Sequence, residues 1–68
     1  MNESDRRSLR EAAGQAEAAE SRVIGLMELS AESKSSKDRM PPEEMAALRE
    51  ISANLRAACT RMWSLAEE

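Results

Sequence analysis

The sequence lacks most of the residues on which enzymes depend. Its 68 residues include no histidine, no tyrosine and no phenylalanine, and only one cysteine and one tryptophan. Without histidine the chain cannot assemble a Ser–His or Cys–His pair, and no imidazole is present to act as a base or a metal ligand. The single cysteine cannot form an internal disulfide, and no cluster of Cys and His exists to hold a structural metal. We therefore expect a protein that is not an enzyme and has no metal or cofactor.

Cysteine and paired carboxylates are the residues that could still carry chemistry. A reactive cysteine needs surroundings that stabilise its thiolate, but the helical neighbours of Cys59 are apolar: Leu55, Ala58 and Met62. We interpret Cys59 as a structural residue. The carboxylates that share a helix face form two pairs, Glu17 with Glu20 and Glu28 with Glu32. On a chain that is 34% charged, such pairs are typical of a solvated helix surface.

Long apolar runs are also missing, as is an excess of positive charge. No stretch approaches the roughly 20 apolar residues of a membrane span, and the first ten residues lack the apolar segment of a signal peptide. The net charge of −3 argues against nucleic acid as the main partner, because phosphate binding requires a basic surface. We expect a cytoplasmic protein that has no membrane partner.

The clearest pattern in the chain runs from Pro42 to Ala66. Apolar residues recur there at alternating spacings of three and four: Leu48, Ile51, Leu55, Ala58, Met62 and Leu65. This period predicts an amphipathic helix over about 42–66, with a short heptad-like apolar row. Pro42 suits the first position of this helix, and Glu43 and Glu44 suit its first turn.

Another helix is predicted earlier in the chain, over about 5–32. Asn2 or Ser4 can cap this helix, and its alanine-rich first half favours helix. The second half is apolar over a wide arc, which is typical of a helix covered on two sides. Residues 33–41 form a basic, serine-rich stretch without apolar period, and they predict a loop. The whole chain, residues 1–68, is thus expected to be one helical-hairpin domain.

Two helices of similar length joined by one loop predict an all-α antiparallel hairpin that folds about residue 37. The apolar row of the helix over 42–66 would then face a matching row on the helix over 5–32: Leu9, Ala12, Ala16, Ala19, Val23, Leu26 and Leu29. With fourteen large apolar side chains besides Met1, a lone hairpin has little to bury. We expect hairpins to pair into a four-helix homodimer or a larger helical oligomer. An alternative has splayed helices in a domain-swapped dimer.

This pairing leaves a set of apolar and small residues pointing outward, which we predict to be a surface for self-association or for a protein partner: Ile24, Met27, Ala31, Cys59, Trp63 and Ala66. Trp63 stands out because tryptophan is enriched where proteins bind one another. The loop carries three cations that could contact an anion: Lys34, Lys37 and Arg39. A second basic cluster lies near the start of the first helix: Arg6, Arg7 and Arg10.

These features favour a small protein-binding module that inhibits, sequesters or chaperones another protein through an apolar helical surface. Its layout is similar to that of short helical hairpins among bacterial secretion co-chaperones and phage-encoded inhibitors of host proteins. An alternative is an oligomeric binder of a small anionic ligand such as a nucleotide, although only Trp63 could stack on a base. A DNA-associated regulator is the least favoured hypothesis, because the chain is acidic.

Overall fold

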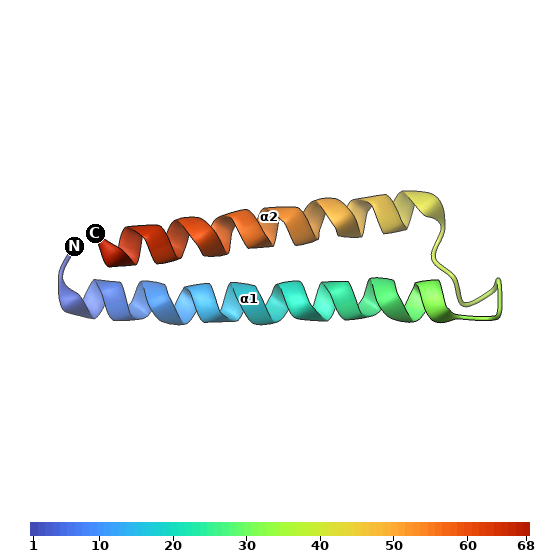
Figure 1. The fold of residues 1–68 in the computed structure, drawn as a ribbon, viewed down its shortest axis with the longest axis horizontal. Helices are drawn as coiled ribbons and strands as arrows, with labels where there is room; N and C mark the ends of the chain where they lie inside the picture. Colours follow the sequence, from blue (N-terminus) through green and yellow to red (C-terminus); the bar gives the residue numbers. More distant parts are fainter.

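The computed structural model describes all residues from 1 to 68 and contains two α-helices, α1 (Glu3–Glu32) and α2 (Pro42–Glu67). The helices run antiparallel and pack along their lengths, so that both chain ends lie at one end of a rod and the loop lies at the other (Figure 1). The rod measures 51 × 15 × 11 Å. The predicted all-α antiparallel hairpin is confirmed, and its helices pair within one chain.

Local chemistry explains where each helix begins. The side chain of Asn2 caps α1 by accepting a hydrogen bond from the backbone N–H of Asp5, with 2.7 Å between the two atoms. Helix α2 has no side-chain cap, but it begins with Pro42, which needs no hydrogen-bond partner for its nitrogen. Glu43 and Glu44 follow in the first turn, where the helix dipole favours negative charge.

The loop is tied back onto the end of α1. The hydroxyl oxygen of Ser30 accepts a hydrogen bond from the backbone N–H of Met40 at 2.8 Å, and Ser30 itself is buried. The guanidinium Nε of Arg39 donates to the carbonyl oxygen of Ser33, also at 2.8 Å. These two bonds bring the chain back beside α1 before Pro41, so that α2 starts next to the helix that it covers.

The helices meet along two heptad rows, which we call the seam. All its members are buried or half-buried: on α1, Leu9, Ala13, Ala16, Glu20, Val23, Met27 and Ser30; on α2, Met45, Leu48, Ser52, Leu55, Cys59, Met62 and Ala66. All residues of α2 outside the seam are exposed. The strict alternation of spacings of three and four is the pattern that keeps two packed helices in contact.

The predicted seam is confirmed for one row of each helix, whose members are Leu9, Ala16, Val23, Leu48, Leu55 and Met62. It is wrong for the other row, so the helices are rotated relative to the prediction. Four large residues of the predicted seam are exposed instead of facing the other helix: Leu26 (49% exposed), Leu29 (69%), Ile51 (45%) and Leu65 (41%). Cys59 and Ala66, which were expected to point outward, lie between the helices. The lengthwise alignment differs little, because the contacts Ala13–Cys59 and Glu20–Arg56 are centred on positions 36 and 38, close to the predicted 37.

Small residues explain the rotation. The seam contains alanine, serine and cysteine at positions such as Ala13, Cys59 and Ala66, and such side chains allow two helix backbones to approach closely. The Sγ atom of Cys59 consequently lies 3.4 Å from the carbonyl oxygen of Ala13. In Figure 1 the two ribbons lie nearer to each other at the terminal end, where alanines dominate, than at the loop end. Larger side chains beside these rows remain outside the contact.

The hairpin has almost no interior. Only three residues are buried, namely Ala13, Ala66 and Ser30, and no large side chain is fully buried. The radius of gyration is 15.6 Å, whereas a compact chain of this length has one of about 11 Å. The fold therefore leaves most of its apolar side chains on its surface.

Candidate functional site

The seam divides the rod into two faces. Residues that directly follow a seam residue lie on one face: Ile24, Ala31 and Arg49 line one groove, and Arg56 forms an ion pair with Glu20 of the other helix. Residues that directly precede a seam residue must then lie on the opposite face of both helices, because the helices are antiparallel. We call the first the charged face and the second the apolar face.

The charged face combines ion pairs with one apolar groove. The ion pairs are Glu20–Arg56, with 2.8 Å between Oε2 and Nε, and Glu3–Arg10. The groove lies near the loop end and has a volume of about 260 Å³. Four apolar side chains and two charged ones line it: Ile24, Met27, Ala31, Met45, Glu28 and Arg49. We call it the loop-end groove.

Trp63 also belongs to the charged face, because it directly follows the seam residue Met62. Its side chain is 38% exposed. Arg49 of the loop-end groove is fourteen residues earlier on α2, which corresponds to about 21 Å along the helix. The structure therefore brings Ile24, Met27 and Ala31 together in one groove, and places Trp63 on the same face about four turns away.

Cys59 and Ala66 do not lie where the sequence predicted them. The predicted outward orientation is wrong for Ala66, which is buried, and for Cys59, whose thiol donates a weak hydrogen bond to the carbonyl oxygen of Ala13. Neither side chain is placed to reach a partner on the outer surface. Glu28, Met45 and Arg49, by contrast, line the loop-end groove but did not belong to the predicted surface. Arg49 could have been found from its heptad position, which is the one that Arg56 and Trp63 also occupy.

The apolar face contains no ion pair and carries most of the exposed large apolar side chains. Its members are Leu26, Leu29, Ile51 and Leu65, with Ala12, Ala19 and Ala58 between them. Sequence reasoning placed these residues in the hairpin contact and so missed them as a surface. Two arginines, Arg22 and Arg61, flank the face and have no acidic partner.

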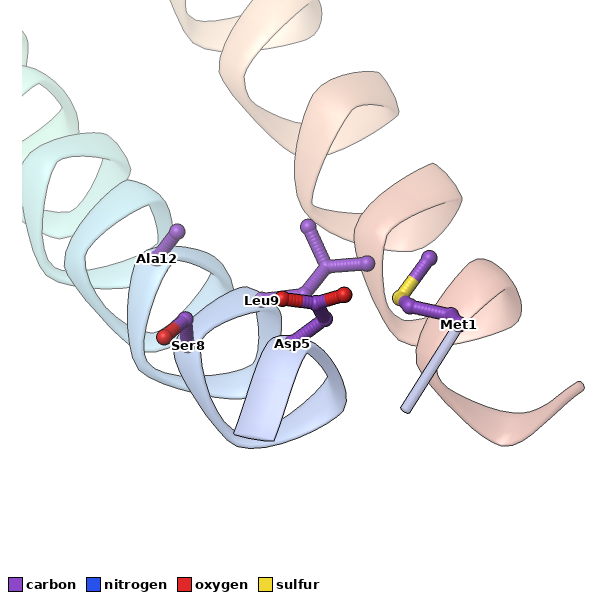
Figure 2. A pocket seen from close by; sticks show the side chains of 5 residues that line it. All are labelled: Met1, Asp5, Ser8, Leu9 and Ala12. Atoms are coloured by element: carbon purple, nitrogen blue, oxygen red, sulfur yellow. The ribbon is translucent and has the colours of Figure 1, made fainter. Parts of the chain in front are cut away.

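A second hollow lies at the open end of the rod, beside the start of α1. It is about 380 Å³ in volume and is lined by Met1, Asp5, Ser8, Leu9 and Ala12 (Figure 2). The side chains of Leu9 and Met1 extend toward the last turns of α2 (Figure 2). Ser8 and Ala12 directly precede seam residues, so this hollow extends the apolar face to the chain ends.

The predicted cationic clusters are partly engaged in structural bonds. Arg39 holds the loop through Ser33, whereas Lys34 and Lys37 are exposed and form no ion pair. In the second cluster, Arg10 pairs with Glu3, and the guanidinium of Arg6 donates to the backbone oxygen of Glu68 at 3.1 Å. The two clusters lie at opposite ends of the rod and do not form one basic patch.

No three residues among Cys, Asp and Glu come together as a possible metal site. Neither α1 nor α2 has an apolar stretch of the length required to cross a bilayer. Comparison with known protein families, with curated proteins and with solved structures finds no match.

Proposed function

We propose that this chain is a small non-enzymatic helical hairpin that works by binding another protein, which it inhibits, sequesters or chaperones. The observation that supports this function is the loop-end groove on the same face as the half-exposed Trp63. Aromatic anchors and apolar contact surface are the usual components of a protein-binding site.

The chemistry of the charged face favours an amphipathic helix as the partner. A helix lying along this face contacts both Trp63 and the loop-end groove if it is at least about fourteen residues long, since the two are about 21 Å apart. Met27 and Met45 line the groove with flexible side chains that adapt to different apolar residues. Arg49 at the rim suits an acidic residue on the partner.

Capture from a lysate of the source organism tests the proposal when matched variants are used. Wild-type protein, Trp63→Ala, Ile24→Glu and the control Ser64→Ala are each immobilised, and the retained proteins are identified by mass spectrometry. Ser64 is exposed on the same helix but neither follows nor precedes a seam residue, so it lies outside the charged face. We expect a protein that wild type and Ser64→Ala retain and that the other two variants lose.

The identified protein is then purified and titrated by calorimetry. Removal of an aromatic anchor costs about 2 kcal/mol or more, so Trp63→Ala should weaken binding by about 30-fold. Equal affinity of wild type, Trp63→Ala and Ile24→Glu would show that the charged face is not the binding site. Helix content of each variant, measured by circular dichroism, separates loss of binding from loss of fold.

A further inference from the structure

Four large apolar side chains on the apolar face are 41–69% exposed. Leu26 and Leu29 come from α1, and Ile51 and Leu65 come from α2. Glu44, directly before Met45 at the loop end, is the one acidic residue on this face. The remaining positions are alanines or the polar residues Ser8, Gln15, Arg22, Asn54 and Arg61. Covering such a surface therefore desolvates few charged groups.

The hairpin exposes more surface than a compact chain of the same mass, and the excess is similar to the area that one partner buries in a standard interface. The hairpin has an accessible surface of 5199 Å². A compact protein of the same 7.5 kDa mass exposes about 4,200 Å², so this chain exposes about 1,000 Å² more. A standard protein–protein interface buries about 800 Å² on each partner. A contact of this size on the apolar face would therefore bring the exposed surface per chain close to that of a compact monomer of the same mass.

We infer that a second copy of this chain packs on the apolar face and completes a four-helix core. The hairpin has only three buried residues, two of them alanines, so it lacks a core of its own. The group that covers the apolar face must accompany the chain whenever it is folded, and another copy of the chain is always present. The contact is isologous, because both copies use the same surface, which includes Leu26, Ile51 and Leu65.

This pairing places the charged faces of the two copies on opposite sides of the dimer. The apolar faces of both copies lie inside the dimer, and the charged faces with Trp63 lie on its two outer sides. The dimer is therefore bivalent, with one loop-end groove on each side. A partner with two helices, or a dimeric partner, would be held by both grooves at once, which raises its apparent affinity without any new contact.

Sedimentation equilibrium over a wide range of protein concentration tests this inference on wild type, Ile51→Glu and the control Ala53→Glu. Ala53 is exposed on the same helix, on the charged side of the seam. Wild type and Ala53→Glu should sediment at twice the chain mass of 7.5 kDa, and Ile51→Glu should lose the dimer. A wild type that stays monomeric at all concentrations would overturn the inference, and so would a dimer that Ile51→Glu leaves intact.

Two further readouts keep the test decisive if Ile51→Glu fails to fold. Because association stabilises the folded state, the melting temperature of the wild type should rise with its concentration. Trp63 lies on the outer side of the proposed dimer, so quenching of its fluorescence by acrylamide should be the same in dilute and concentrated samples. A melting temperature independent of concentration, or shielding of Trp63 on association, would contradict pairing through the apolar face.

Discussion

The two faces of the hairpin come from the same helices but differ in the side chains that they carry. The charged face is bridged by the Arg56–Glu20 ion pair, whereas the apolar face exposes Leu26, Ile51 and Leu65 without any polar link. Each helix has three neighbouring rows of apolar or small residues, and contact with one other helix covers two of them. The third row is left over, and its large side chains make the two faces unequal.

The largest effect should follow from making the apolar face as polar as its opposite. In Leu26→Lys with Ile51→Lys, two large side chains that bury in the proposed dimer become charged. Each contributes about 1.5–3 kcal/mol when fully buried, so the folded dimer should lose on the order of 3–6 kcal/mol per chain. We expect a monomer with reduced helix content, measured by sedimentation and circular dichroism.

The matched control places the same charges on the other face. Ala31→Lys with Ala53→Lys changes two exposed residues on the charged face, and it should leave mass and helix content unchanged. Equal loss of helix in both double variants would mean that the two faces do not differ in the way proposed.

A smaller effect is expected at the seam itself, where close approach of the backbones decides which row is left over. Ala13 is fully buried, and the thiol of Cys59 lies against its carbonyl oxygen. Ala13→Leu overfills this point, and overpacking typically costs about 1–3 kcal/mol. Denaturant unfolding measures the change, with the exposed Ala18→Leu as control. Tolerance of leucine at position 13 would show that close packing there does not set the rotation.

The sequence predicts helices, loop and alignment because these depend on local signals. Asn2 caps α1, Pro42 starts α2, and the serine-rich loop separates them, all within one or two residues of the expected bounds. The fold point near residue 37 follows from the similar lengths of the two helices. The hairpin therefore required no information beyond helix period and helix termini.

The rotation of the helices could not be predicted in the same way. The row that includes Ile51, Ala58 and Leu65 is more apolar than the seam row that includes Ser52, Cys59 and Ala66, so hydrophobicity favours the wrong row. Two isolated helices, however, approach most closely where their side chains are small. A search for small residues in heptad register, rather than for large apolar ones, would have found Ala13, Cys59 and Ala66 in the seam.

At the loop, the bond between Ser30 and Met40 holds the alignment on which both faces depend. Ser30→Ala removes the acceptor for the half-buried backbone N–H of Met40. An unsatisfied donor of this kind costs about 1–3 kcal/mol, and partial access to water places the expected loss near the lower value. Thermal unfolding measures it, with Ser36→Ala in the exposed part of the loop as control. Equal stability of the two variants would show that the loop closes without this bond.

The smallest effect is expected from the ion pair of the charged face. The Arg56 side chain is 73% exposed, although that of Glu20 is only 13% exposed. Arg56→Ala alone leaves the Glu20 carboxylate without a partner, so the pair is measured by a double-mutant cycle with Glu20→Ala.

The coupling free energy of this pair should be about 0.2–1 kcal/mol, and it should fall as salt is added. The Glu3–Arg10 pair, which is also partly exposed, serves as a reference of similar size. Neither cycle should change the mass of the protein in solution. A coupling above about 2 kcal/mol for Glu20–Arg56 would exceed what an exposed pair supplies. The rotation of the helices would then depend on charge across the charged face as much as on the small residues of the seam.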